Sequence, residues 1–279
     1  MMEQAYWLKT NEGSNPPQDL KDHFDGKFSL YSPERTMCLG ADQFAHTSSS
    51  PAYKGFNELW IPWTVEEMWE WMKTGEGVSP YSRPQHKRGL YEGRLEETEK
   101  VPSQCMTRSI FCISLLKHTK TPARVRVGFT PIRKADGRTR YVHHNELEYL
   151  EDDSWQLRDP ADIDREFIHS YRAIEMIKEN EADVGDFFLP NGKKGIPTLM
   201  KTIVEDVLAL SNEPVVPWRV VRKYRDRDVG SLGFSGIDER IYFENLAREL
   251  HDVLKNPTPE KLEEIRRAGN VSCELRKNS

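Results

Sequence analysis

The sequence predicts an α+β fold in which one helix precedes an antiparallel sheet. Apolar residues recur at steps of three and four over 105–118, which is typical of a helix. Three segments with strand character follow at 121–129, 139–150 and 154–160, and short turn-forming stretches separate them. Short connections favour antiparallel neighbours, so we expect the helix and the strands to form one α+β core.

The N-terminal part of the chain is expected to be mostly irregular. Residues 1–55 are rich in Ser, Asn, Pro and Gly, which favours irregular backbone. A helix begins after Thr64, because Thr64 and Glu67 have capping-box spacing and Trp63 and Met68 have the spacing of a hydrophobic staple. The tryptophans of this region could line an acyl pocket, but we interpret them as core residues: Trp60, Trp63, Trp69 and Trp71.

The remaining elements are a polar connector and a helical C-terminal third. The stretch 75–103 has little periodicity and is interpreted as a long connector that could border a site. Helices are expected at 162–180, 196–212, 237–255 and 258–268, with a break at 212–218. We therefore expect an irregular N-terminal segment that packs on the core, a core, and a helical extension or cap in the same globular unit, over residues 1–60, 61–162 and 163–279.

Composition excludes several classes of protein. The 279 residues are 37% hydrophobic and 30% charged, with a formal net charge of −5, so the chain can bury a core and has no basic block typical of a nucleic-acid groove. The N-terminus lacks the features of a signal peptide, and no apolar run of about 18 residues occurs, so we expect a cytoplasmic protein without a membrane partner. The spacing of the four cysteines is typical of neither a disulfide framework nor a zinc site; they are Cys38, Cys105, Cys112 and Cys273.

Residues suited to thiol catalysis occur in the predicted core. Cys105 opens the predicted helix, whose N-terminus carries partial positive charge that favours a thiolate and can stabilise an oxyanion. His144, in the second strand, is a candidate general base. Asp159, at the end of the third strand, is a candidate for orienting that base, because pairing of the second and third strands would bring Asp159 beside His144.

A series of short motifs extends this pattern: Cys105, KTPAR (120–124), Gly128, HNELE (144–148) and WQLRDP (155–160). It resembles the pattern of the transglutaminase-like superfamily, in which a cysteine that opens a helix is followed by GIPAR, a strand glycine, a HAWVE strand and a W…DP strand. The resemblance covers roughly residues 100–162. It implies a papain-type core with Cys105 as nucleophile, His144 as general base and acid, and Asp159 as the residue that orients His144.

Some positions depart from the family pattern. Glu146 stands where the family has an aromatic residue, Lys120 replaces the usual glycine, and Thr107 stands where an acid is common. Glu146 shares a strand face with His144, so it could contact substrate, bind a cation or replace Asp159 in orienting the base. A solvated strand edge is an equally good interpretation of Glu146.

Other polar residues of the core have weaker indications. Gln104 could contribute to an oxyanion hole, by analogy with papain-type enzymes. A metal site built on HHNE (143–146) is disfavoured because its ligands alternate between strand faces, so no metal is expected. We interpret Arg124 and Arg126 as residues that hold the fold through ion pairs.

The resulting hypothesis is an enzyme that acts on an amide or ester through a Cys105 thioester, resolved by an amine or by water and without a cofactor. The expected partner is a peptide or a small amide or amine substrate, and the sequence does not indicate an oligomeric state. Two alternatives remain open: a cysteine peptidase with the same triad, and a non-catalytic binding protein with the same fold.

Overall fold

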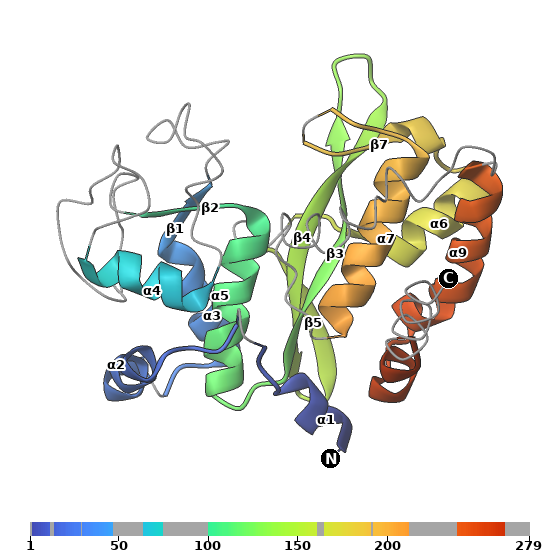
Figure 1. Ribbon diagram of the computed structural model, residues 1–279. Helices are drawn as coiled ribbons and strands as arrows, with labels where there is room; N and C mark the ends of the chain where they lie inside the picture. Colours follow the sequence, from blue (N-terminus) through green and yellow to red (C-terminus); the bar gives the residue numbers. More distant parts are fainter. Residues whose placement is uncertain are drawn as a thin grey trace, which may run out of the picture. The chain divides into compact units, whose positions relative to one another are not determined.

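The computed structural model describes an α+β protein, as predicted (Figure 1). Some predictions concern residues that the structure does not describe: Trp60, Trp63, Cys273, the connector at 75–99 and the break at 212–218. The described ranges are 2–11, 14–28, 30–46, 64–74, 100–160, 165–190, 192–211 and 239–265.

The prediction of an irregular N-terminus was wrong. Three helices and a strand occur there: α1 (Met2–Trp7), α2 (Gln18–Phe28), α3 (Pro33–Asp42) and β1 (Phe44–His46). In α2 the apolar residues Leu20, Phe24 and Phe28 recur every fourth position and are buried, so a short amphipathic stripe outweighs the polar composition. Helix α3 has a favourable N-terminus, because the Ser32 side chain caps it by accepting a hydrogen bond from the Arg35 N–H and Pro33 occupies the first turn.

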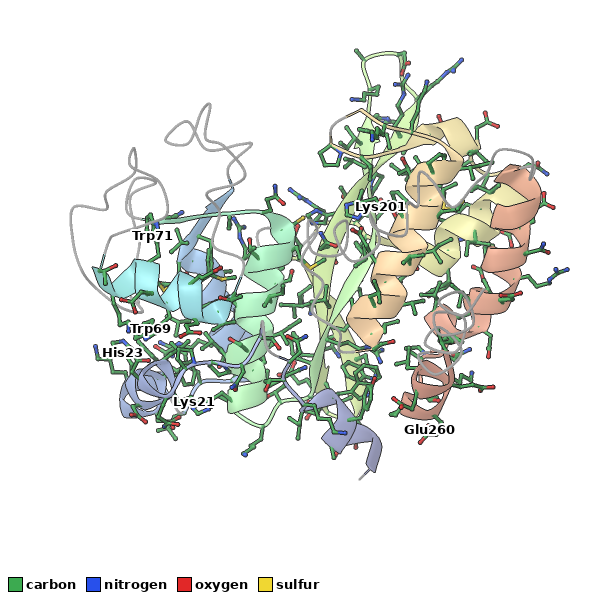
Figure 2. All side chains as sticks on the ribbon, viewed as in Figure 1. Lys21, His23, Trp69, Trp71, Lys201 and Glu260 are labelled. Atoms are coloured by element: carbon green, nitrogen blue, oxygen red, sulfur yellow. The ribbon has the colours of Figure 1, made fainter. Side chains whose placement is uncertain are left out.

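Helix α4 (Val65–Thr74) begins as predicted. The Thr64 N–H donates to Glu67 Oε2 at 3.0 Å, and the Glu67 N–H donates to Thr64 Oγ1 at 3.1 Å, which completes the capping box. Trp69 and Trp71 are buried, which confirms their interpretation as core residues. Figure 2 shows Trp69 close to His23 of α2, with their ring centroids 5.3 Å apart.

The predicted helix and strands of the core are all present. Helix α5 (Cys105–His118) follows β2 (Val101–Ser103), and the sheet strands are β3 (Ala123–Arg133), β4 (Thr139–Glu151), β5 (Ser154–Arg158) and β6 (Ile168–His169). The strand order is β5-β4-β3-β6, with β7 (Phe187–Phe188) paired in parallel to β4. Strand β1 pairs in parallel with β2 in a separate small sheet.

The described C-terminal part is mainly helical, with two short strands that were not predicted, β6 and β7. The helices are α6 (Ser170–Lys178), α7 (Ile196–Leu210) and α9 (Glu239–Lys255). The short 3-10 helix η4 (Val184–Asp186) lies between α6 and α7, and residues 259–265, which are also helical, follow α9. The helix expected at 162–180 forms only from Ser170, because Ile168 and His169 pair with β3. Gly128 permits this pairing, since a Cβ at that position would lie 2.3 Å from the Ile168 carbonyl oxygen.

The chain forms two compact units, each assembled from separated segments. Unit 1 contains Met1–Tyr6, Arg126–His144 and Glu166–Ser279, and unit 2 contains Trp7–Val125 and Asn145–Arg165. The sequence analysis divided the chain into three contiguous parts, 1–60, 61–162 and 163–279. The two units of the structure are instead divided within β3 and β4. Both long strands therefore contribute residues to each unit.

Arg124 links the N-terminal segment of unit 2 to its sheet. Its Nε donates to Glu148 Oε2 at 2.6 Å, and both side chains are buried. The guanidinium carbon lies 3.8 Å from the ring centroid of Trp155 and 4.6 Å from that of Trp7. The cation is thus neutralised and covered by two aromatic rings.

Arg126 has a comparable role in unit 1. Its guanidinium makes two hydrogen bonds of 3.1 Å to the carboxylate of Asp206 in α7, and the Arg126 Nη2 also donates to the Leu254 carbonyl oxygen of α9. Asp206 additionally accepts from the Val127 N–H at 2.9 Å and from the Ser170 hydroxyl at 2.6 Å. The prediction that Arg124 and Arg126 hold the fold through ion pairs is therefore confirmed.

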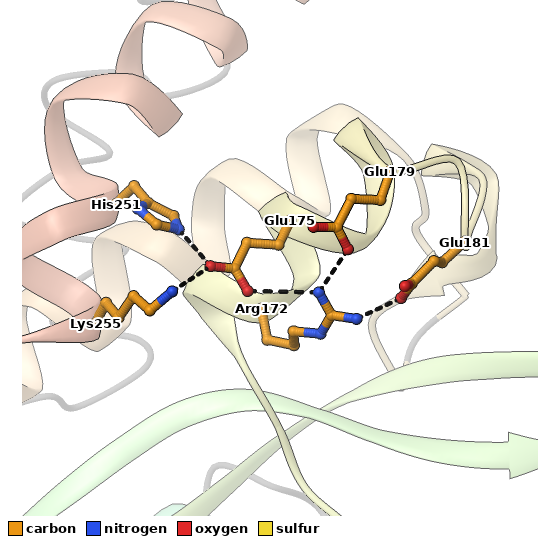
Figure 3. Close-up of polar contacts among 6 residues, drawn as sticks. All are labelled: Arg172, Glu175, Glu179, Glu181, His251 and Lys255. Carbon is orange, nitrogen blue, oxygen red and sulfur yellow. Dashed lines mark hydrogen bonds and ion pairs between the residues drawn. The ribbon is translucent and has the colours of Figure 1, made fainter.

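A second, more exposed network joins α6 to α9. Glu175 accepts hydrogen bonds from His251 at 3.0 Å and from Lys255 at 2.8 Å, and it also contacts Arg172 (Figure 3). Arg172 pairs further with Glu179 and Glu181. The hydrogen bond from Lys255 lowers the pKa of Glu175 below its ordinary value, although partial burial opposes this shift.

The two networks of unit 1 should differ in their contribution to stability. Asp206→Ala leaves the buried Arg126 without its carboxylate, so we expect a loss of about 3–5 kcal/mol in the free energy of unfolding. Glu175→Gln alters solvent-exposed pairs and should cost about 1 kcal/mol or less. Urea denaturation of both variants checks this order, and equal losses would contradict it.

Lys117 predicts a pH dependence of stability. Its Nζ donates to the Lys9 carbonyl oxygen at 2.5 Å, and burial lowers the pKa of Lys117 to about 8. The unfolded state, with an ordinary lysine pKa of about 10.4, therefore binds the proton more tightly than the native state. The free energy of unfolding should rise as the pH increases from about 8 towards 10.

The matched variant for this prediction is Lys117→Met. Urea denaturation from pH 7 to pH 10 should show stability increasing in the wild type relative to Lys117→Met. A difference between the two proteins that stays constant over this range would refute the prediction.

Candidate active site

The candidate nucleophile Cys105 is the first residue of α5. Gln104 has extended backbone, and its N–H donates to Thr107 Oγ1 at 2.9 Å. The first helical hydrogen bond runs from the Arg108 N–H to the Gln104 carbonyl oxygen, so the N–H groups of the first turn point beyond the helix start. Cys105 is partly exposed at this positively polarised end.

The sulfur of Cys105 receives a hydrogen bond that the sequence analysis missed. Asn145 Nδ2 donates to Cys105 Sγ at 3.1 Å, and Asn145 is 3% exposed. Strand β4 supplies Asn145, immediately after His144. Alternation along a strand places the side chains of His144 and Asn145 on opposite faces, so the sequence carried no local signal for this contact.

Asp159 lies beside Glu146 in unit 2. Strands β4 and β5 pair with Leu147 opposite Arg158, and Glu146 and Asp159 each follow one step beyond this pair. Their nearest carboxylate oxygens lie within 4.8 Å of one another. The strand register therefore brings two acids together at the end of β5.

Both acids are buried, so the interpretation of Glu146 as a solvated strand edge was wrong. Glu146 is 1% exposed, and Asp159 is also buried. Two buried carboxylates this close require a cation or a shared proton. Arg165 supplies a cation, because its Nη1 lies 3.2 Å from Asp159 Oδ2.

His144 is a buried residue of β4, and side-chain alternation places it on the same strand face as Glu146. His143 has the opposite orientation and a different partner. Its Nε2 lies 2.9 Å from Glu205 Oε2 of α7, and Lys201 also binds Glu205 at 2.8 Å. His143 is therefore paired with α7.

The charge of Glu205 is stabilised by this arrangement. Burial by itself would raise the pKa of Glu205, but the hydrogen bond from His143 and the charge of Lys201 lower it below its ordinary value. The cluster lies in α7 and in the part of β4 that belongs to unit 1. Its charges are neutralised within unit 1, where His143 of HHNE (143–146) pairs with Glu205.

Hard cations prefer oxygen ligands, and Glu146 and Asp159 are the carboxylates that could provide them. No organic cofactor is needed for thiol acyl chemistry. Unit 2 contains two polar arrangements: a helix-terminal thiol whose sulfur accepts a hydrogen bond from an amide, and a pair of buried acids at the end of β5.

Comparison of the chain with protein-family models, with curated proteins and with solved structures finds no match. Among the helices that the structure describes, none has both the length and the apolar character needed to cross a bilayer.

Differences between the cysteine environments predict an order of reactivity. Burial raises the pKa of Cys112 far above its ordinary value, and burial together with Asp42 and Glu34 raises the pKa of Cys38. Cys105 is partly exposed at a helix N-terminus. Of these three described cysteines, iodoacetamide at neutral pH should label Cys105 first, Cys38 slowly and Cys112 only after unfolding.

Peptide mapping by mass spectrometry after timed labelling measures this order. Labelling in urea provides the control, because all three thiols should then react at similar rates. Faster labelling of Cys38 than of Cys105 in the native protein would contradict the prediction.

Proposed function

We propose that the protein is a cysteine enzyme of transglutaminase-like type, which forms a thioester between Cys105 and the acyl group of an amide or ester. The observation that carries the proposal is the environment of the Cys105 sulfur. It is partly exposed at the start of α5, and it accepts a hydrogen bond from the buried amide of Asn145. Both features favour the thiolate, which is the nucleophilic form.

In the first half of the reaction, His144 takes the proton from the Cys105 thiol. The thiolate attacks the carbonyl carbon, and the N–H groups at the start of α5 stabilise the oxyanion of the tetrahedral intermediate. His144 then returns the proton to the leaving amine or alcohol as the carbon–nitrogen or carbon–oxygen bond breaks. The product of this half-reaction is an acyl-thioester on Cys105.

In the second half, water or an amine attacks the thioester while His144 accepts its proton. The thiolate leaves, and Cys105 is regenerated. Water gives hydrolysis and an amine gives acyl transfer.

Asp159 is proposed to orient the His144 imidazole. Its burial and its ion pair with Arg165 support a carboxylate held in one orientation. Glu146 is the neighbouring acid, and its burial supports a role within the site rather than on a solvated edge. Gln104, which precedes the nucleophile, is proposed as a contributor to the oxyanion hole.

The test is the rate of Cys105 alkylation by iodoacetamide between pH 5 and pH 9. In the wild type, labelling should be fast at pH 6, and His144→Ala should abolish this fast phase, because the imidazolium no longer stabilises the thiolate. Cys105→Ser identifies the residue that is labelled. Labelling that rises only near pH 8.5 and is unchanged by His144→Ala would refute the proposal, since an unperturbed thiol has a pKa of about 8.5.

His143→Ala is the matched control for His144→Ala. It removes a histidine from the adjacent position of β4, where the ring pairs with Glu205. Alkylation of Cys105 at pH 6 should be unaffected in this variant. An equal loss of reactivity in both histidine variants would indicate damage to β4 rather than a base.

A further inference from the structure

Asn145 contacts the reacting sulfur, but the proposed mechanism uses only one of the two polar atoms of its carboxamide. Its Nδ2 donates to Cys105 Sγ, and both residues belong to unit 2. The other polar atom of the same carboxamide, Oδ1, is buried and has no hydrogen-bond partner among the residues that the structure describes. Buried acceptors are rarely left unpaired, so this atom requires an explanation.

The two atoms of the carboxamide have opposite hydrogen-bonding properties. Nδ2 only donates, and a donated hydrogen bond stabilises a thiolate more than a thiol. Oδ1 only accepts, so it can bind the N–H of a ligand but not the alkoxy oxygen of an ester. Covalent geometry places Oδ1 within about 5.5 Å of the sulfur, since Nδ2 and Oδ1 share one carbon atom.

We infer that Asn145 is a catalytic residue whose Nδ2 stabilises the Cys105 thiolate and whose Oδ1 accepts the N–H of the acyl donor, so that the site takes amides in preference to esters. This inference rests on the proposed function and narrows its substrate class. On this inference, the N–H of an amide bound at the partly exposed sulfur pairs with Oδ1, which lies within about 5.5 Å of that sulfur. The acceptor that is unpaired in the unliganded protein is then satisfied in the complex.

The first measurement tests the Nδ2 role through the pH profile of Cys105 alkylation. Asn145→Asp keeps the shape of the side chain but replaces the N–H donor with a negative acceptor, so the midpoint should rise by about one pH unit or more. Labelling at pH 6 should fall about tenfold or more, because each unit of thiol pKa changes the thiolate fraction about tenfold below the midpoint. Asn145→Ala should shift the midpoint in the same direction by less.

The second measurement tests the Oδ1 role with two alkylating reagents. Iodoacetamide carries N–H groups, whereas N,N-dimethyl-iodoacetamide has none. The ratio of their rates on Cys105, divided by the ratio on N-acetylcysteine, cancels their intrinsic reactivities. We expect this normalised ratio to be several-fold above one in the wild type and close to one in Asn145→Ala.

The outcomes separate this inference from the proposed function. A midpoint that depends on His144 but not on Asn145 would overturn the Nδ2 role and leave the thiol enzyme intact. A normalised ratio of one in the wild type would overturn the amide preference. An ordinary thiol midpoint near pH 8.5, insensitive to His144, would instead refute the proposed function.

The fold of the variants is checked separately. Asn145→Asp and Asn145→Ala should retain wild-type circular dichroism, and Cys112 should remain unlabelled in both, because its protection depends on the packing of α5. A variant that labels at Cys112 is partly unfolded. In that case Asn145→Ser replaces it, because the serine hydroxyl is too short to reach the sulfur. The midpoint of Cys105 alkylation should then shift upward as in Asn145→Ala. An unshifted midpoint in Asn145→Ser would overturn the inference.

Discussion

Two buried arginines of β3 must be neutralised for the structure to form. Removing a guanidinium from water is unfavourable unless its charge is paired and its N–H groups are bonded. Arg124 meets this requirement in unit 2 through Glu148 and two tryptophan rings, and Arg126 meets it in unit 1 through Asp206 and the Leu254 carbonyl oxygen. Each unit therefore has its own charge pair on a strand that passes through both.

These pairs also define where distant parts of the chain are attached. Asp206 connects α7 to β3 and, through Ser170, to the start of α6. Trp7 covers Arg124, so the N-terminal segment of unit 2 is tied to the sheet. Close backbone approach contributes as well, because Gly128 lets β6 pair with β3 and Gly40 lets α3 pack beside Cys112 of α5.

The proposed chemistry depends on the same framework in unit 2. The end of β2 leads into α5, whose first residue is Cys105, and β4 supplies Asn145 to its sulfur. The register of β4 against β5 determines that Asp159 lies next to Glu146. Thiol, amide and acids thus come from three elements whose relative positions are set by helix packing and strand pairing.

Local patterns in the sequence determined the main elements and their order. Helical periodicity, the Thr64 capping box and the turn signals were sufficient for α4, α5, β3, β4 and β5, because these features act within a few residues. Polar composition did not predict the N-terminal helices, because the buried four-residue repeat of Leu20, Phe24 and Phe28 stabilises α2 in spite of it. The departure at Lys120 has a local explanation too: its φ of 65° is a conformation that glycine adopts more readily, and it ends α5.

Tertiary structure alone decided which polar residues are buried and what they contact. The sequence placed Cys105 at a helix start and His144 in a strand, but it did not reveal the bond from Asn145 to the sulfur or the burial of Glu146. It also did not reveal the strand at 168–169, which depends on the space at Gly128. These features arise from contacts between segments far apart in the chain, whereas sequence patterns report only on neighbouring residues.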